Sequence, residues 1–361
     1  MSASPNGTGF GLALEPSGVS VLDLFAGAGG LSLGLRMAFP TSKFMLVDVD
    51  PDCVRTLRLN FPEAEVVQGD IRGLDFTRLR ATVLAAGPPC QGFSKLNRHR
   101  VGDPRNDLVS EIVRATRNTR PQVVVVENVP DFLNSANAEH LKSSLLGLDY
   151  IIKSGVLNCA DYGVPQIRKR ALVIGVCRGL PLPWPEATHS RTPDGTRLSW
   201  RTVADAFAML PTNPDGANWH RPYAARALSD PRYRAIPPGG SRRNLPPDLQ
   251  LRCWRQTRGY SDVLGRLMWD RPSTTVRTAF FRPEKGRFLH PISDRPITVR
   301  EAARLQSFPD SFGFPEDLSL ESVGRQIGNA LPPLVAFAFG RALGRVLTHS
   351  RSCSAEQAVQ S

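Results

Sequence analysis

The segment at residues 82–94 constrains the fold more than any other part of this chain. An apolar run, residues 82–86, leads into Gly87-Pro88-Pro89 and then Cys90. This pattern predicts a buried strand that delivers a thiol at its carboxyl end, which is the edge where open α/β sheets place their chemistry. An ordinary buried cysteine in a turn is the simpler interpretation, so the surrounding sequence has to decide.

Length and charge narrow the class of protein. A chain of 361 residues is long enough for two domains. The net charge of +12 points to an anionic partner, nucleic acid before membrane, although an arginine-rich composition without consequence is the alternative. No run of 18 apolar residues and no signal peptide are found, so we expect a cytosolic protein that does not span a membrane. The six cysteines lack paired spacing, which supports neither a zinc site nor disulfides.

A second apolar run ends in a glycine-rich turn. Gly27 and Gly29 lie between a predicted strand and a segment with helical spacing, so a ligand can meet backbone N–H groups at a helix start. About twenty residues later, the strand at residues 44–47 ends in Asp48. An acidic residue at this distance is suited to ribose hydroxyls. Together these features favour a cofactor that contains a nucleoside.

Two further predicted strands end in carboxylates. Residues 65–69 lead to Asp70 and Ile71, a carboxylate and an apolar side chain that can bracket an adenine ring. The run at residues 121–126 is β-branched throughout, typical of a buried parallel strand, and it ends in Glu127. Burial should raise the pKa of this carboxyl so that it can hold a proton near neutral pH. A structural glutamate is the alternative.

Basic residues follow the predicted site. The polar loop at residues 96–106 places Arg98 and Arg100 where they can meet phosphate, unless the loop is merely solvated. Arg168 and Arg170 are two residues apart at the start of another apolar run, so their side chains should share one face of a strand. Surface solvation is the usual outcome for such a pair.

The composition changes near Gly179. Residues 178–280 hold sixteen arginines and no lysine, together with all five tryptophans. Because arginine reads guanine and phosphate through two hydrogen bonds, we expect a second domain that contacts nucleic acid. Within it, the loop that contains Arg242 and Arg243 is the candidate for groove contacts. Further along, Thr298 predicts a helix N-cap, and the last apolar helix should end near residue 347.

Six segments, in this order, resemble the DNA (cytosine-5)-methyltransferases. They are DLFAGAGGLSLG (23–34), GPPCQGFS (87–94), ENV (127–129), QIRKR (166–170), REAARLQSFPD (300–310) and GNALPP (328–333). The resemblance implies an α/β fold: a Rossmann-like S-adenosylmethionine-dependent methyltransferase domain with a second, smaller, loop-rich target-recognition domain. The expected boundaries are 18–178 plus 322–348 for the catalytic domain and 179–321 for the target-recognition domain and return segment, with loose tails at 1–17 and 349–361.

The resemblance also implies roles for the catalytic residues. Cys90 would attack C6 of a cytosine, and Arg168 or Arg170 would lower the pKa of its thiol. Glu127 would hold the N3 edge of the ring, and Arg168 would contact O2. S-adenosylmethionine would supply the methyl group, leaving S-adenosylhomocysteine, and no metal would be needed. The target base would have to leave the duplex, with Gln91 and Ser94 as candidates for filling the vacated space.

The cofactor pocket implied by the resemblance combines the glycine turn with five other positions. Phe25 would pack on the adenosyl group, and Asp48 would bind the ribose hydroxyls. Aspartate stands at this position where glutamate is frequent in the family, and its shorter reach affects that contact alone. The remaining positions are Asp70, Ile71, Leu108 and Asn329.

The expected partner is double-stranded DNA, bound by a monomer in the bacterial cytosol at the nucleoid. A cognate restriction endonuclease acting separately is compatible with this interpretation. Two other functions stay open: a tRNA cytosine-5 methyltransferase, which the long arginine-rich insert disfavours, and a catalytically silent DNA-binding regulator. A dehydrogenase would leave the Pro-Pro-Cys-Gln segment unexplained.

Overall fold

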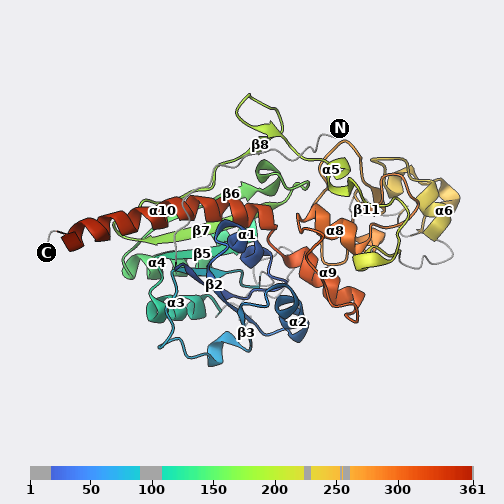
Figure 1. Ribbon diagram of the computed structural model, residues 1–361. Coiled ribbons are helices and arrows are strands. Elements are labelled where there is room, and N and C mark those ends of the chain that lie inside the picture. Colours follow the sequence, from blue (N-terminus) through green and yellow to red (C-terminus); the bar gives the residue numbers. More distant parts are fainter. Residues whose placement is uncertain (1–17, 90–107, 223–228, 253, 255–260, 360–361) are drawn as a thin grey trace, which may run out of the picture.

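The structure, a computed structural model, describes residues 18–89, 108–222, 229–252, 254 and 261–359. Figure 1 shows two lobes side by side. One contains the main sheet, and the smaller one carries α5, α6, α8 and β11. The α/β class expected from the sequence is confirmed.

The main sheet has seven strands in the order β3-β2-β1-β4-β5-β7-β6. Parallel pairing runs from β3 to β5, and β7 is antiparallel to both of its neighbours. The strands are β1 (Ser20–Leu24), β2 (Lys43–Asp48), β3 (Glu65–Gln68), β4 (Val83–Ala86), β5 (Val123–Asn128), β6 (Tyr150–Asn158) and β7 (Lys169–Cys177). Because β1, β4 and β5 are adjacent and parallel, their carboxyl ends meet at one edge of the sheet.

Helices cover both faces of this sheet. The helices of the sheet-containing lobe are α1 (Gly30–Ala38), α2 (Pro51–Asn60), α3 (Leu108–Thr119), α4 (Ala136–Gly147), α9 (Leu320–Asn329) and α10 (Pro333–Val359). Alternate residues of the central strands belong to two separate apolar clusters, one shared with α1 and α10 and the other with α3 and α4. The near-continuous apolar runs of these strands follow from burial on both faces.

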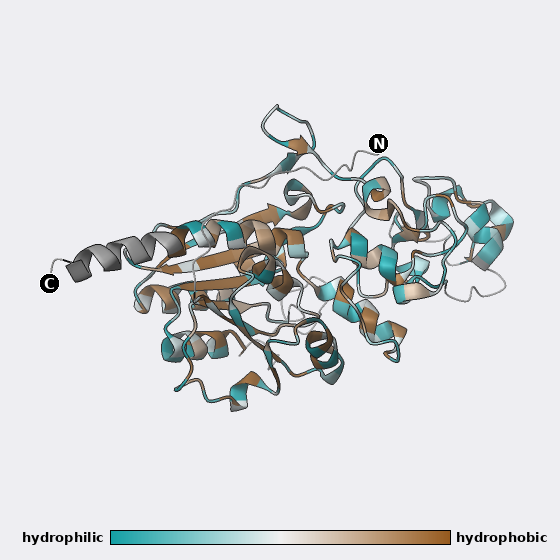
Figure 2. Ribbon diagram, in the orientation of Figure 1, coloured by the Kyte–Doolittle hydropathy of each residue, from teal (hydrophilic) through white to brown (hydrophobic). Residues whose placement is uncertain are grey.

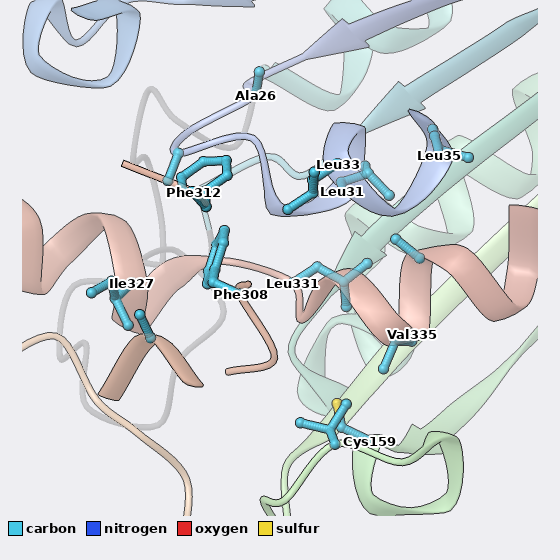
Figure 3. Close-up of a cluster of buried hydrophobic side chains, with 14 of the residues drawn as sticks. Ala26, Leu31, Leu33, Leu35, Cys159, Phe308, Phe312, Ile327, Leu331 and Val335 are labelled. Atoms are coloured by element: carbon cyan, nitrogen blue, oxygen red, sulfur yellow. The ribbon is translucent and has the colours of Figure 1, made fainter. Parts of the chain in front are cut away.

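The first and last helices of the sheet-containing lobe pack directly on each other. A Cβ at Gly34 would lie 2.3 Å from the Pro333 carbonyl oxygen, and one at Gly30 would lie 2.3 Å from that of Leu331. Figure 3 shows the apolar side chains that fill this contact. The stretch Leu320–Leu347 is long and apolar enough to cross a membrane by length and composition, and 67% of its apolar window is buried in the fold.

The smaller lobe is rich in loops and short elements. They are α5 (Val203–Phe207), α6 (Ser229–Arg234), β10 (Gly265–Arg266), β11 (Arg287–Leu289) and α8 (Val299–Leu305). The paired strands β8 (His189–Ser190) and β9 (Leu198–Ser199) lie apart from these, with β8 against residues 159–162 of the sheet-containing lobe (Figure 1). The smaller lobe has a small apolar cluster of its own, formed by Tyr233, Ile236, Leu245, Leu264 and Leu289. In Figure 2 the strands of the main sheet are coloured as more hydrophobic than most of this lobe.

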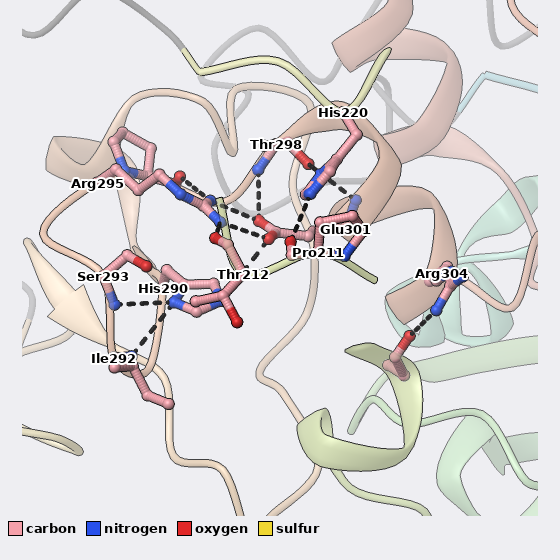
Figure 4. Close-up of polar contacts among 12 residues, drawn as sticks. Pro211, Thr212, His220, His290, Ile292, Ser293, Arg295, Thr298, Glu301 and Arg304 are labelled. Atoms are coloured by element: carbon pink, nitrogen blue, oxygen red, sulfur yellow. Dashed lines mark hydrogen bonds and ion pairs between the residues drawn. The ribbon is translucent and has the colours of Figure 1, made fainter. Parts of the chain in front are cut away.

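The predicted N-cap of α8 is confirmed. The Thr298 side chain accepts a hydrogen bond from the Glu301 backbone N–H, and the Glu301 carboxylate accepts one from that of Thr298. Arg295 donates to both carboxylate oxygens of Glu301, at 2.8 Å each. His220 contacts the Thr298 hydroxyl at 3.0 Å, so the helix start is enclosed by side chains from distant segments (Figure 4).

The last helix is longer than expected. A loose tail is expected from residue 349, whereas α10 continues to Val359. Residues 348–359 contain neither glycine nor proline, so nothing in the sequence breaks the helix after its buried part ends. The other expected tail, residues 1–17, lies outside the described residues.

Candidate active site

Strand register brings three predicted positions to one edge of the sheet. Leu24 pairs with Ala86, and Ala86 pairs with Val126. The residues that follow, Phe25, Gly87 and Glu127, are therefore neighbours beyond the ends of β1 and β4 and at the end of β5. A Cβ at Gly87 would lie 3.6 Å from the Glu127 Oε2 atom, so the absence of a side chain there leaves the carboxylate open on that side.

Glu127 forms an ion pair with Arg170. The Arg170 Nε atom lies 2.8 Å from Glu127 Oε1, and only about a tenth of either side chain is exposed. In the antiparallel pair β5 and β7, Glu127 is opposite Leu172, so Arg170 is its diagonal neighbour on the same face. Burial raises the pKa of Glu127, and the charges of Arg170 and Arg168 oppose that shift. The site thus combines a carboxyl that gains protons readily with a fixed cation.

Arg168 does not share this position: its side chain bonds to other segments, and the contact with the substrate base that the sequence predicts for it stays a prediction. Its side chain is 1% exposed. Nη1 donates to the Val276 carbonyl at 3.0 Å, and Nη2 donates to the Gly328 carbonyl at 2.7 Å. Arg168 and Arg170 are two residues apart, but Arg168 precedes β7. Its guanidinium lies between the Val276 carbonyl and the end of α9.

The glycine turn after β1 is held by the predicted ribose-binding acid. Asp48 Oδ2 accepts a hydrogen bond from the Gly27 N–H at 2.7 Å, and Oδ1 accepts one from the Asp50 N–H at 2.8 Å. Burial raises the pKa of Asp48, and these N–H bonds oppose the rise. Gly27 has a φ of +56°, and a Cβ there would meet nothing within 4 Å. The turn therefore borders open space beside a carboxylate, a suitable place for a nucleoside.

The other predicted cofactor positions come from three further parts of the chain. Ile71 is buried, and Leu108 is the first residue of α3. Asp70 is exposed and pairs with Arg72, which lowers the pKa of Asp70 to about 2. Asn329 is the exposed last residue of α9. The residues present fit a cofactor with an apolar adenine site and ribose acceptors.

The remaining predicted residues divide into two groups. Cys90, Gln91, Ser94, Arg98 and Arg100 lie outside the described residues. Two others lie in the smaller lobe. Arg242 is only 7% exposed, with its guanidinium carbon 5.9 Å from the Trp254 ring centre, whereas its neighbour Arg243 is exposed. Arg242 is therefore buried near an aromatic ring and Arg243 faces solvent, and their groove contacts stay predictions.

Sequence reasoning missed two positions near the turn. Val49 follows β2 with 65% of its surface exposed, between Asp48 and Asp50. The sequence signal for Val49 is a single apolar residue between two acidic residues directly after a strand. Asp23, inside β1, is fully buried and accepts a hydrogen bond from Ser32. Across the described part of the chain, no group of three His, Cys, Asp or Glu side chains is placed to hold a metal ion.

Comparisons with known proteins agree with the geometry. The family model of the C-5 cytosine-specific DNA methylases matches residues 19–345. The Type II methyltransferase M.Eco47II of Escherichia coli is 36% identical over 91% of this chain and 79% of its own length. The Type II methylase M.HgiDII of Herpetosiphon aurantiacus is 34% identical over 92% of this chain and 94% of its own length.

Solved structures share the fold. A crystal structure described as a DNA modification methyltransferase encoded within an E. coli prophage superposes with a TM-score of 0.70, at 26% identity over 91% of this chain and 99% of that one. The Dnmt2 methyltransferase of S. pombe superposes with a TM-score of 0.63 at 16% identity, covering 92% of this chain and 99% of the other. The second likeness concerns the fold alone.

Proposed function

Because this chain belongs to the C-5 cytosine-specific DNA methylase family, we propose that it methylates one cytosine of a short duplex sequence as the modification enzyme of a restriction-modification system. The family makes it a DNA (cytosine-5)-methyltransferase. A separate partner endonuclease, a monomeric state and a bacterial cytosolic location belong to the same proposal.

The observation that carries the proposed mechanism is the buried ion pair between Glu127 and Arg170. Both side chains lie where β5 and β7 reach the edge of the sheet, and the Asn128 side chain donates to the Pro88 carbonyl at 3.1 Å. Pro88 precedes Cys90 by two residues in the sequence, and the residue next to Glu127 holds the Pro88 backbone. Cys90 itself lies outside the described residues.

We assign the reaction steps to these side chains. The Cys90 thiolate adds to C6 of the cytosine, and electron density moves toward C5. The Glu127 carboxyl, which burial helps to keep protonated, donates its proton to N3. Arg170 takes the place first assigned to Arg168: it orients Glu127 and stabilises negative charge on the ring.

The cofactor and the end of the cycle complete the scheme. S-adenosylmethionine, when bound beside the glycine turn, supplies an electrophilic methyl group. The Asp48 carboxylate would accept hydrogen bonds from its ribose hydroxyls, and Phe25, Val49 and Ile71 would hold the adenine. Once C5 carries the new methyl group, a base from the solvent would remove the C5 proton, and the electron pair would expel the Cys90 thiolate. N3 would return its proton to Glu127, which restores the aromatic ring. C6 is inaccessible inside a duplex, so the base must be flipped out.

The smaller lobe is our candidate for target recognition. It contains exposed arginines, among them Arg243 and Arg271, and it has its own apolar cluster. We propose that residues 179–321 read the recognition sequence while the main lobe performs the transfer.

Bisulfite sequencing of DNA from cells that express this chain tests the proposal. We expect protected cytosines within one short motif and none with Cys90→Ala. Glu127→Gln, which cannot donate a carboxyl proton, should reduce kcat by about 10² or more, while the exposed Glu63→Gln should not. Soluble parent protein that protects no cytosine would refute the proposal.

A further inference from the structure

Three polar side chains are buried together behind the candidate active site. Gln166 and Gln306 are 0% exposed and Arg168 is 1% exposed. Gln166 and Arg168 lie in the connection between β6 and β7, and Gln306 is the C-cap of α8. Gln166 Nε2 donates to Gln306 Oε1 at 2.9 Å. Burial of a charge and two amides costs free energy unless they form well-placed hydrogen bonds. The hydrogen-bond partners of these side chains therefore show which backbone segments the cluster fixes.

One set of partners is the end of α9. Arg168 Nη2 donates to the carbonyls of Gly328 at 2.7 Å and Ala330 at 3.3 Å. Gln306 Nε2 donates to the carbonyl of Ile327 at 2.5 Å. The last carbonyls of a helix lack intrahelical partners, and a cation there also complements the helix dipole. Arg168 therefore fixes the backbone on both sides of Asn329.

The other partner is the return segment from the smaller lobe. Arg168 Nη1 donates to the Val276 carbonyl at 3.0 Å, and Gln166 Oε1 accepts the Val276 N–H at 2.9 Å. Ile167 donates its N–H to the Ser273 carbonyl at 2.9 Å. The guanidinium thus joins the end of α9 to a strand-like segment that does not belong to the sheet.

The backbone after Asn329 has little freedom to move. A Cβ at Gly30 would lie 2.3 Å from the Leu331 carbonyl oxygen, so this backbone touches the start of α1. Figure 3 shows Leu331 beside Leu31 and Leu33 of α1. On the other side of α9, a Cβ at Gly328 would lie 2.4 Å from the Thr278 nitrogen. A shift of the α9 end therefore moves Asn329 relative to the glycine turn.

We propose that Arg168 is a positioning residue for cofactor binding, which acts through the Gly328 and Ala330 carbonyls to set Asn329 against the glycine turn. This inference rests on the proposed function, because it takes S-adenosylmethionine as the ligand of that turn. The two arginines then have different roles. Arg170 acts with Glu127 on the reacting base, and Arg168 positions Asn329 for cofactor binding.

Calorimetric titration with S-adenosylhomocysteine in the absence of DNA provides the first test. Arg168→Met keeps the length of the side chain and removes every donor, and we expect its Kd to rise about tenfold or more, as for other small misplacements of binding groups. Arg168→Lys keeps the positive charge but loses the planar guanidinium with its two donor nitrogens. The Kd of this variant for S-adenosylhomocysteine should therefore rise less. The exposed Arg117→Met should bind like the parent.

Steady-state kinetics provide the second test. For Arg168→Met we expect KM for S-adenosylmethionine to rise, with kcat recovered at saturating cofactor because the Glu127–Arg170 pair is intact. A lower kcat with an unchanged Kd for S-adenosylhomocysteine would instead make Arg168 a base contact and overturn the inference. If Arg168→Met does not fold, Arg168→Lys decides, and an unchanged Kd for that variant overturns the inference. A parent protein that does not bind S-adenosylhomocysteine would refute the proposed function itself.

Discussion

Replacement of Asp23 by asparagine should change how the stability of the protein depends on pH. Asp23 lies inside β1 with no exposed surface. One carboxylate oxygen accepts a hydrogen bond from the Ser32 hydroxyl, and the other has no hydrogen-bond partner in the described part of the chain. Burial raises the pKa of Asp23 to about 7, the Ser32 bond opposes the rise, and the nearby Asp48 charge adds to it.

The magnitude follows from the difference between the folded and unfolded pKa values. The rise from 3.8 to about 7 corresponds to about 4 kcal/mol, since each pKa unit is worth about 1.4 kcal/mol. The folded state holds the proton more tightly, so this stability is fully present below the unfolded pKa and is lost as pH rises toward 7. Between pH 5 and pH 8 the loss from this group is about 2–3 kcal/mol. Asparagine does not titrate, so the Asp23→Asn variant loses no stability from this position over the same pH range.

Urea unfolding at pH 5, 6, 7 and 8 measures the effect. The free energy of unfolding of Asp23→Asn minus that of the parent should become more positive by about 2–3 kcal/mol across this range. Titrating groups far from Asp23 are common to both proteins and cancel in the difference, whereas the coupled Asp48 does not cancel fully. The exposed Asp248→Asn serves as the matched control for the removal of a surface carboxylate. A flat difference for Asp23→Asn would show that its carboxyl is not held protonated and would refute the reasoning.

Three further changes test the packing and the turn. Gly34→Ala drives a Cβ into the Pro333 carbonyl and should cost about 1–3 kcal/mol in urea unfolding; Gly73→Ala, where a Cβ meets open space, should cost much less, and equal losses would contradict the packing argument. Thr298→Ala removes the N-cap of α8 and should cost about 1–2 kcal/mol; an unchanged urea midpoint would show that the cap is dispensable. Gly27→Ala adds a side chain at a φ of +56° beside open space. The Kd for S-adenosylhomocysteine, measured by calorimetry, should rise while Tm changes little, and an unchanged Kd would place the cofactor elsewhere.

Local sequence patterns predicted the strand ends well because each one depends on its own residues. An apolar run followed by glycine or an acid placed Phe25, Asp48 and Glu127 at strand ends, and the structure gathers them at one edge of the sheet. The capping box at Thr298 was equally local, since both of its members lie within four residues.

The roles of the two arginines needed information that no local pattern holds. Alternation predicted one shared face for Arg168 and Arg170. The partner of Arg170 is set by the register of β5 against β7, strands separated by some forty residues of chain. The partners of Arg168 lie more than a hundred residues away, at Val276 and Gly328. The alternation of side chains along one strand does not show which distant backbone carbonyls will accept hydrogen bonds from a given side chain.

Composition also failed to separate the two arginines of the predicted groove loop. Charge counts treat Arg242 and Arg243 alike, and both stand in a glycine-rich, polar stretch. The structure buries Arg242 near Trp254 while its neighbour stays exposed. Only the fold of the smaller lobe decides which of two adjacent cations faces water.

The contact between α1 and α10 has a consequence for synthesis on the ribosome. The helix that follows the glycine turn finds its packing partner some three hundred residues later, at Pro333 and beyond. Contacts between such distant parts of a chain form late and slow folding. Until residues 333–347 emerge, the part of α1 that packs on α10 has nothing to cover it. A nascent chain should therefore gain cofactor affinity only when translation is almost complete.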